Sequence, residues 1–277
     1  MRAPTSSGIS RRRLDRIYAR YNRREWVHPD PVEFLYDYPD VRDREIVGLV
    51  ASTLAYGRIL QIQRSVGWVL ERMGSPAAFL RGASRHSLAQ TFVGFRHRFT
   101  TSGEVAGLLY GAKRVIESEG SLYACFLSGL QDKDETVVPA LSRLVGCLLA
   151  ESGGGGSSLL SPPERGSACK RLNLFLRWMV RRDQVDPGGW DGVPASKLVV
   201  PLDTHLYRIS RALGMTARRT ADLRTAMEVT RAFRKIAPED PVRYDFALTR
   251  LGIRGELDAA ELLKPVGSTS GRDPCTQ

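Results

Sequence analysis

The chain has 277 residues, which is enough to bury a full hydrophobic core, either as one domain or as two closely packed lobes. Hydrophobic residues make up 42% and charged residues 26% of the sequence, as in a soluble globular protein, and no apolar run is long enough for a transmembrane helix. The formal net charge of +11 suits a polyanionic partner such as nucleic acid, although charge alone leaves a merely basic protein as the alternative.

The number and spacing of the cysteine and histidine residues indicate whether metal sites are present and whether the protein occupies a reducing or an oxidising cellular compartment. No Cys-x-x-Cys pair is present, so the sequence indicates neither a structural zinc site nor a disulfide framework, and it fits a reducing cytoplasm. The histidines form no metal-spaced pair, and the basic first residues lead into no apolar core, so we expect no bound metal and no signal peptide. These residues are Cys125, Cys147, Cys169, Cys275, His28, His86, His97 and His205.

The first half of the chain is predicted to be a run of helices. Residues 1–10 are expected to form a disordered tail, and a basic helix follows from Arg11. Asp43 is the expected N-cap of a helix over Ile46–Tyr56, whose small apolar residues predict a central, buried position. Further helices are predicted over Val32–Tyr38, Gln61–Arg72, Glu104–Ser118, Leu122–Leu130 and Val137–Ala150, and from Pro76 onward.

The segment Phe95–Phe99 interleaves aromatic and basic residues. Such a patch can bind DNA through base stacking and phosphate contacts. A helix start with solvated arginines is the simpler interpretation, and we prefer it. Because no stretch of the chain alternates polar and apolar residues well enough to predict a strand, the fold class is predicted to be all-α.

The second half contains two breaks between predicted helices. Residues 151–158 (ESGGGGSS) predict a flexible surface loop, since no strand precedes them and no Gly-Lys-Ser/Thr follows to bind phosphate. Asp183–Lys197 is a Pro/Gly-rich excursion. Helices are predicted over Thr220–Ile236 and Pro241–Gly252, and residues 264–277 are expected to form a disordered tail.

Two amphipathic segments flank this excursion. In Lys170–Arg182, apolar residues recur at the i, i+3, i+4, i+7 and i+8 spacing of one helix face. In Pro201–Gly214, Asp203 is a good N-cap and a stripe of apolar residues follows it. Basic side chains share the opposite face of the first helix, namely Lys170, Arg177 and Arg181.

Both segments resemble parts of a known enzyme family. Pro201-Leu202-Asp203-Thr204-His205-Leu206-Tyr207-Arg208 resembles the segment that carries the catalytic aspartate in helix-hairpin-helix (HhH-GPD) DNA glycosylases of the endonuclease III superfamily. Lys170-Arg171-Leu172-Asn173 resembles the Lys-x-x-Asn that follows their DNA-binding hairpin. The resemblance covers residues 165–255, with a weaker part around 46–80. It implies one helical unit of two lobes over residues 11–263, with the active-site cleft between the lobes.

The spacing of the two segments indicates which branch of the glycosylase superfamily the chain resembles most. Lys170 and Asp203 are 33 positions apart. Asp183–Lys197 looks like the insertion that separates the same two residues in the archaeal 8-oxoguanine glycosylase branch and in a related bacterial family. Many endonuclease III relatives carry a four-cysteine iron–sulfur cluster, and this sequence has no such motif, so no cofactor is expected.

The resemblance assigns a role to each of these two residues. Lys170 is expected to be the nucleophile, which must be deprotonated to attack the sugar. Asp203 is expected to stabilise positive charge on the sugar and to take a proton from the lysine. The alternatives are a lysine on a solvated helix face and an aspartate that only caps its helix.

The remaining candidate residues follow from the positions of the family's functional segments. The family's hairpin reads Leu-Pro-Gly-Val-Gly, whereas Pro163-Glu164-Arg165-Gly166-Ser167 has one glycine, so a remodelled hairpin is expected at the start of the catalytic segment 163–214. Free backbone N–H groups there would bind phosphate. The DNA-binding candidates are Gly166, Ser167, Ala168, Arg171, Arg58, Arg177 and Arg208. The base-pocket or wedge candidates, each with core packing as its alternative, are Thr53, Tyr56 and Trp178.

We therefore expect a DNA repair glycosylase with AP-lyase activity, acting as a monomer on double-stranded DNA that contains a damaged base. By the resemblance, an oxidised purine such as 8-oxoguanine is the leading substrate. The alternatives are a monofunctional glycosylase for another lesion, such as an alkylated base, a non-catalytic DNA-binding module and a helical protein-interaction scaffold. We expect no membrane partner and a cytoplasmic, nucleoid-associated location.

Overall fold

The structure, a computed structural model, describes residues 9–152 and 158–254. This part is mostly helical, which confirms the all-α prediction, and its only strands form one small hairpin. Every helix in these ranges is too short or too polar to cross a lipid bilayer. The tail predicted at 264–277 lies outside the described residues, as does the tail at 1–10 apart from Ile9, which is buried, and Ser10.

The α-helices are α1 (Arg11–Tyr21), α2 (Val41–Thr53), α3 (Ile59–Met73), α4 (Pro76–Gly82), α5 (Arg85–Thr91), α6 (Ser102–Glu119), α7 (Leu122–Leu127), α8 (Val138–Glu151), α9 (Lys170–Val180), α10 (Thr204–Ala212), α11 (Leu223–Arg234) and α12 (Asp245–Arg254). Four 3₁₀ helices supplement them: η1 (Arg24–Trp26), η2 (Pro31–Asp37), η3 (Pro163–Arg165) and η4 (Ala195–Lys197). The two strands are β1 (Arg96–His97) and β2 (Thr100–Thr101).

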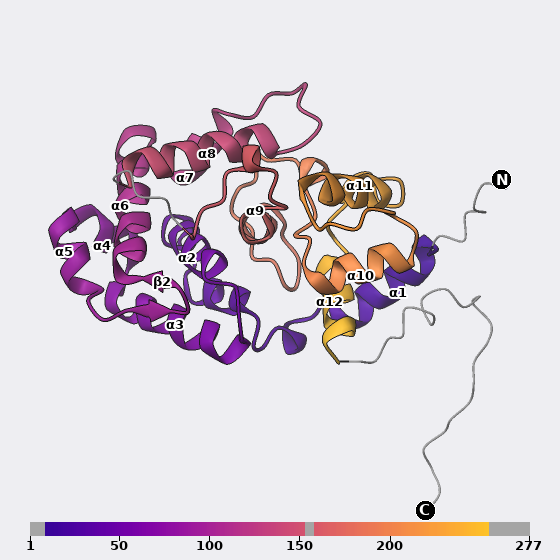
Figure 1. Ribbon diagram of the computed structural model, residues 1–277, viewed down its shortest axis with the longest axis horizontal. Coiled ribbons are helices and arrows are strands. Elements are labelled where there is room, and N and C mark those ends of the chain that lie inside the picture. Colours follow the sequence, from indigo (N-terminus) through magenta and orange to yellow (C-terminus); the bar gives the residue numbers. More distant parts are fainter. Residues whose placement is uncertain (1–8, 153–157, 255–277) are drawn as a thin grey trace, which may run out of the picture.

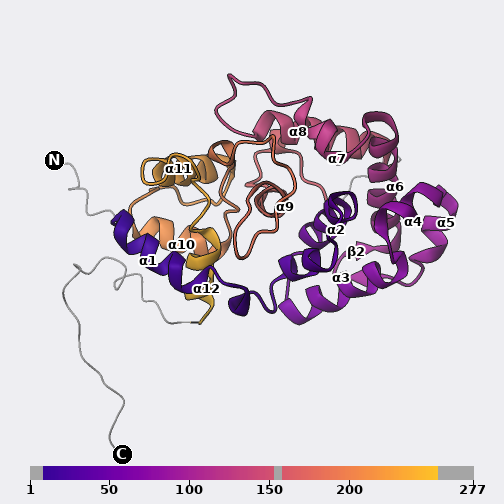
Figure 2. The same cartoon turned by 180° about the vertical axis from the view of Figure 1, so that it is seen from behind.

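The helices are arranged around a central pair, α2 and α9, which pack against each other. Helices α3 to α8 lie at one end of the molecule, and α1, α10, α11 and α12 lie at the other (Figure 1). The same grouping is seen from behind (Figure 2). Helix α1 packs along α12, so the beginning and the end of the described chain meet at one end of the molecule. The pair α2–α9 therefore joins the two groups of helices.

Helix α2 is buried on nearly all sides, as its small apolar residues predict. Each residue from Glu45 to Thr53 is buried. One of them, Gly48, has no side chain and lets its neighbours approach closely. A Cβ at Gly48 would lie 3.1 Å from the ring of Phe175 in α9. This contact explains why a run without an apolar–polar period forms the centre of the fold rather than a surface helix.

The N-cap predicted for α2 is wrong. Asp40 caps α2, because its Oδ1 accepts a hydrogen bond from the backbone N–H of Arg42 at 2.7 Å. Asp43 lies in the first turn of α2 and caps α4 instead, with its Oδ1 accepting from the N–H of Ala77 at 2.7 Å. Two aspartates three positions apart give the same sequence signal, and only tertiary packing decides between them.

A second carboxylate of α2 also serves another helix. Glu45 is buried and accepts hydrogen bonds from the backbone N–H groups of Leu122 at 3.2 Å and Tyr123 at 3.1 Å, at the start of α7. Burial raises the pKa of Glu45 to about 6, against the lowering effect of these bonds. Helix α2 thus supplies the N-terminal partners of both α4 and α7.

The segment Phe95–Phe99 forms a β-hairpin, so the helix start expected there is wrong. Arg96 pairs with Thr101 and His97 with Thr100, and Arg98 has a left-handed φ of 54° in the turn. His97 is fully buried and anchors the hairpin. Its Nδ1 lies 2.9 Å from Ser65 Oγ and its Nε2 lies 2.9 Å from the backbone oxygen of Tyr56. These long-range bonds have no signature in the local sequence.

Gly111 allows α6 and α8 to pack closely, because a Cβ there would lie 2.5 Å from the backbone oxygen of Leu148. We expect Gly111→Ala to lower the free energy of unfolding by about 1–3 kcal/mol, since neither helix backbone can shift cheaply. The matched control is Gly146→Ala on α8, whose added Cβ meets no described atom within 4 Å. That change is expected to stabilise the helix by about 0.5–1 kcal/mol. Urea denaturation measures both variants, and equal midpoints would contradict the expectation for Gly111.

The excursion Asp183–Lys197 is packed into the core rather than loosely attached. Trp190 is completely buried, and its ring lies 5.0 Å from that of Phe175 in α9 and 5.3 Å from that of Phe126 in α7. The backbone N–H of Trp190 donates to the oxygen of Met179 at 2.8 Å. The excursion therefore fixes the far end of α9 against α7.

Candidate active site

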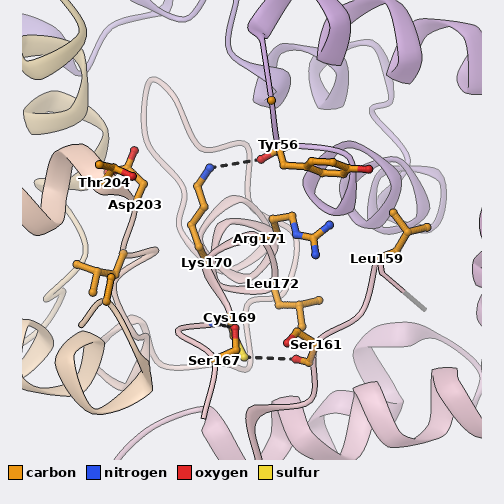
Figure 3. A pocket seen from close by; sticks show the side chains of 14 residues that line it. Tyr56, Leu159, Ser161, Ser167, Cys169, Lys170, Arg171, Leu172, Asp203 and Thr204 are labelled. Carbon is orange, nitrogen blue, oxygen red and sulfur yellow. Dashed lines mark hydrogen bonds between the residues drawn. The ribbon is translucent and has the colours of Figure 1, made fainter. Parts of the chain in front are cut away.

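A pocket of about 450 Å³ lies where the end of α2, the start of α9 and the start of α10 meet. We call it the first pocket. Figure 3 shows Lys170 rising between Asp203 on one side and Tyr56 on the other. The structure therefore brings the two predicted catalytic residues into one pocket. Its lining residues are Ala55, Tyr56, Gly57, Leu159, Ser161, Ser167, Cys169, Lys170, Arg171, Leu172, Leu202, Asp203, Thr204 and Ala221.

A second pocket of about 230 Å³ adjoins the first. Ala55, Gly57, Lys170 and Asp203 line both, so the lysine and the aspartate lie where the two pockets meet. The second pocket also contains residues of α12, which the sequence did not single out for the site. These are Asp245, Phe246, Thr249 and Arg250, and they lie beside Asp30 and Arg177.

The Lys170 amine is held by a weak contact. Its Nζ donates to the backbone oxygen of Ala55 over 3.4 Å, near the long limit for a hydrogen bond. The side chain is half-buried, and within the described residues it forms no ion pair with a carboxylate. An amine with one long hydrogen bond costs little to release toward a ligand in either pocket.

Asp203 caps α10, as predicted. Its Oδ1 accepts from the backbone N–H of Leu206 at 2.7 Å. Among the described residues, no side chain or N–H donates to its other oxygen at hydrogen-bond distance. The cap thus orients the carboxylate, while its second oxygen is available to the two pockets that it lines. The structural and the chemical interpretation of Asp203 are therefore compatible.

The segment before α9 is a turn held against the start of α11. Gly166 has a left-handed φ of 77°, its oxygen accepts from the N–H of Leu223 at 3.0 Å, and Ser167 bridges to Asp222. Cys169 precedes α9 with a φ of 48° and gives the helix no side-chain cap. The first N–H groups of α9 therefore receive no acceptor from the side chain at the cap position, and the residues that carry them line the first pocket.

The three residues predicted to contact DNA in this turn differ in their exposure to solvent. Gly166 is exposed and Ser167 lines the first pocket, so both can still meet a ligand. Ala168 is buried, so its side chain does not contact DNA, whereas the contact predicted for this segment is through backbone N–H groups. Its backbone oxygen accepts from Asn173 Nδ2 at 3.0 Å. Burial raises the pKa of Cys169 to about 11, so this thiol stays protonated at neutral pH.

Arg171 clamps the end of α2 rather than pointing outward. Its two terminal nitrogens donate to the backbone oxygens of Thr53 at 2.7 Å and Ser158 at 2.6 Å, and its guanidinium lies 5.1 Å from the centre of the Tyr56 ring. Burial lowers its pKa. These bonds use the groups that a phosphate would need, so the predicted DNA contact is wrong for this conformation. Its charge nevertheless adds to that of Lys170 in the first pocket.

The base-pocket candidates separate clearly. Thr53 is buried and its hydroxyl donates to the oxygen of Leu49 at 2.7 Å, and Trp178 is completely buried, so both belong to the core. Tyr56 lines the first pocket, and its hydroxyl donates to the oxygen of His97 at 2.8 Å. Its ring stacks on Phe99 at 4.9 Å. Of the three, only Tyr56 is placed to touch a ligand.

Phe99 is an exposed aromatic residue beside the first pocket, and its sequence pattern does not mark it individually as a site residue. It is 59% exposed at the tip of the hairpin and stacks on Tyr56. Two more exposed apolar side chains, Ile59 and Leu60, begin α3 directly after Gly57 and Arg58. Arg58 itself is exposed, as is Arg208 on α10, which is compatible with the phosphate contacts predicted for both.

Arg177 does not contact DNA, because it is buried in an ion-pair network. It pairs with Asp186 at 3.2 Å and with Asp245 at 2.5 Å. Arg181, on the same face of α9, pairs with Asp186 as well. Further ion pairs join Arg181 to Asp183 and Asp240. The basic face predicted for α9 therefore holds the excursion Asp183–Lys197 and α12 in place. Of its three members, Lys170 lines both pockets, Arg177 lines the second with its guanidinium bound in ion pairs, and Arg181 lines neither.

Asp186 and Asp245 are expected to lose their protons at a higher pH than ordinary aspartates. Burial raises the pKa of each to about 6, although Arg177 opposes the shift and, for Asp245, the charge of Asp203 adds to it. The native state then binds more protons than the unfolded chain between the ordinary aspartate pKa and about 6, so these groups lower stability as the pH rises through that window. Carbon-detected NMR of the two carboxyls measures the midpoints. Midpoints near an ordinary aspartate value would contradict this expectation.

Among the described residues, no group of three or more His, Cys, Asp or Glu side chains is placed to hold a metal ion. The fold and the pockets define a helical protein with a lysine and an aspartate at the junction of two cavities. Residues 30–254 match a protein family described as "Protein of unknown function (DUF2400)". Because this match spans most of the 277 residues, the chain belongs to that family. No curated protein and no solved structure matches the chain.

Proposed function

We propose that this protein is a DNA N-glycosylase with AP-lyase activity, on a two-lobed glycosylase-like fold. The observation that supports this most is the position of Lys170 and Asp203. They come from different helices, they are the residues that the glycosylase resemblance selects, and they line the same two adjoining pockets. A pair that only capped a helix and covered a solvated face would not need to share a cavity.

The chemistry follows from this pair. Lys170 Nζ attacks the sugar C1′ of the damaged nucleotide, and the C1′–base bond breaks as the new C–N bond forms. The amine gives a proton to the free oxygen of Asp203, from which it passes to the departing base. The C1′–O4′ bond then breaks, O4′ takes a proton from water, and the opened sugar is left as an imine between Lys170 and C1′. Loss of a proton from C2′ then expels the 3′ phosphate and cuts the strand.

Several charges would hold the DNA. The chain carries a formal net charge of +11, Arg58 and Arg208 are exposed, and the first residues of α9, whose N–H groups receive no side-chain cap, line the first pocket. Phosphate contacts of this kind position a nucleic acid without reading its sequence. The lesion itself must then be recognised inside a pocket.

The second pocket suits the extracted base. It lies next to Lys170 and Asp203, it has the apolar ring of Phe246, and it has the buried carboxyl of Asp245 as a hydrogen-bond acceptor. An oxidised purine such as 8-oxoguanine presents ring N–H donors to such an acceptor. Extracting a base in this way is the general requirement of glycosylases.

A single-turnover assay tests the proposal. We expect the wild-type protein to release the base from a duplex with one 8-oxoguanine and to cut the strand at that position. Base release without cutting would identify a monofunctional glycosylase. The absence of both base release and strand cutting, at 8-oxoguanine and at an abasic site, would contradict the proposed activity.

A non-catalytic DNA-binding module is the second candidate, because the turn before α9 has one glycine and the guanidinium of Arg171 is occupied within the protein. Such a module would bind duplex DNA with a steep salt dependence but leave the lesion intact. A protein-interaction scaffold would show no such salt dependence.

A further inference from the structure

A third cavity, of about 170 Å³, lies on the outer side of α3 beside the β-hairpin. We call it the α3 pocket. It is separate from the first two, with which it shares no lining residue. At about 30 Å³ per water molecule in the liquid, its volume corresponds to roughly five or six waters, the scale of one planar heterocycle. Gln61, Arg64, Ser65, Trp68, Phe95 and Arg96 line it.

The lining combines aromatic rings with cations. Trp68 and Phe95 pack against each other with ring centres 5.4 Å apart. Arg64 and Arg96 are exposed at this pocket, and within the described residues neither forms an ion pair with a carboxylate. Aromatic rings and arginine planes stack on nucleobases, and guanidinium groups bind phosphate. Gln61, whose Nε2 donates to Ser65 Oγ at 3.2 Å, adds an amide oxygen that can accept a hydrogen bond from the edge of a base. This lining therefore fits a nucleotide better than an apolar or a cationic ligand.

The α3 pocket is built into the same unit as the first pocket. Buried His97 bonds to Ser65, which lines the α3 pocket, and to the backbone of Tyr56, which lines the first. The hairpin contributes to both places, with Phe95 and Arg96 at the α3 pocket and Phe99 stacked on Tyr56. One buried histidine thus fixes the wall between the two.

The separation of two lining residues along α3 can be compared with the rise per base of DNA. Ile59, in the second pocket, and Arg64, in the α3 pocket, are five residues apart on α3, which corresponds to an axial separation of roughly 7.5 Å at 1.5 Å per residue. Stacked DNA rises by about 3.4 Å per base, so this separation corresponds to about two base steps.

We propose that the α3 pocket is a second nucleotide subsite, which takes an unstacked base of the bound DNA within a few steps of the lesion, with its phosphate on Arg64 and Arg96. As part of a DNA complex this inference rests on the proposed function, but the pocket itself is testable without any lesion. The base belongs either to the damaged strand or to the opposite strand, and the second experiment below distinguishes them.

The first experiment uses the full chain labelled with 5-fluorotryptophan and observed by fluorine NMR. The chain has four tryptophans, and Trp68→Phe assigns the resonance of Trp68. Deoxyadenosine monophosphate is expected to shift that resonance, and deoxyribose 5-phosphate is not. No shift, or an equal shift with both ligands, would overturn the proposal, since the latter would indicate an anion site only.

Charge variants supply the control. The double variant Arg64→Gln, Arg96→Gln is expected to weaken nucleotide binding by at least about tenfold, because it removes two charge-assisted contacts. Arg81→Gln, at another exposed arginine on α4 outside this pocket, is expected to leave binding unchanged. Equal affinities for the double variant and the wild type would contradict the assignment of Arg64 and Arg96.

The second experiment scans 2-aminopurine along each strand of a duplex that holds an uncleavable abasic-site analogue. A change in fluorescence at one position, present with the wild type and lost with the double variant, is expected within about three steps of the analogue. No responding position on either strand would refute the subsite on DNA. Covalent trapping is assayed on the same protein in parallel. Failure of both covalent trapping and base release, together with retained nucleotide binding, would refute the glycosylase proposal and leave the assignment of the α3 pocket intact.

Discussion

Lys170→Gln is expected to abolish the covalent adduct that borohydride traps between this protein and a duplex with one 8-oxoguanine, and to slow strand cutting by roughly 10³-fold or more. Glutamine is polar and only one atom shorter than lysine, but it cannot form an imine. Because the Lys170 amine has one long hydrogen bond, to Ala55, its loss should leave folding intact. Gel analysis after reduction measures the adduct, and circular dichroism checks the fold.

Two further variants make this experiment specific. Lys235→Gln, at an exposed lysine after α11, removes an equal charge and should leave the adduct unchanged. Asp203→Asn keeps an N-cap, since asparagine caps as well as aspartate, but removes the proton acceptor, so cutting is expected to fall by roughly 10²–10⁴-fold. An adduct that persists in Lys170→Gln would show that another amine is the nucleophile.

Asp186→Ala is expected to lower the free energy of unfolding by about 3–5 kcal/mol. Asp186 is fully buried and pairs with both Arg177 and Arg181, so the change leaves two buried guanidinium groups with part of their partners missing. It also removes a link between α9 and the excursion Asp183–Lys197. Chemical denaturation followed by circular dichroism gives the difference in free energy.

The matched control lies in the same excursion. Asp191 pairs with Arg182 at 3.5 Å, and both side chains are largely exposed. Asp191→Ala should cost no more than about 1 kcal/mol, as for most surface ion pairs. A similar loss for Asp186→Ala and Asp191→Ala would mean that burial of the network contributes nothing to stability.

Local sequence patterns predicted the elements of the fold well, because helix periodicity and capping are local properties. The start of α10 at Asp203, the burial of α2 and the helical class all followed from residues within a few turns of one another. The predictions at Asp43 and at Phe95–Phe99 were wrong because contacts between residues far apart in the sequence decide the structure there. Asp43 caps a helix more than thirty residues away, and His97 holds the hairpin through Ser65 and Tyr56.

The candidate site was predicted only where a motif marked it. The lysine and the aspartate were selected by resemblance, and they do line one pocket. Helical spacing alone placed Arg177 on a solvated face, whereas the carboxylates that bury it come from positions 186 and 245. Asp245 could have been suspected from its place in an apolar-faced helix, because an aspartate among inward-facing residues needs a buried partner. Nothing in the sequence indicates that it reaches the second pocket.

The two carboxylates with which α2 caps its neighbours have a consequence for how this end of the molecule opens. Asp43 completes the start of α4, and Glu45 completes the start of α7. Loss of α2 from its place would remove, at the same moment, the acceptors of the Ala77 N–H in α4 and of the Leu122 and Tyr123 N–H groups in α7. Amide protons of α4 and α7 should therefore exchange with solvent in the same event as those of α2, so that residues 41–53, 76–82 and 122–127 behave as one cooperative folding unit.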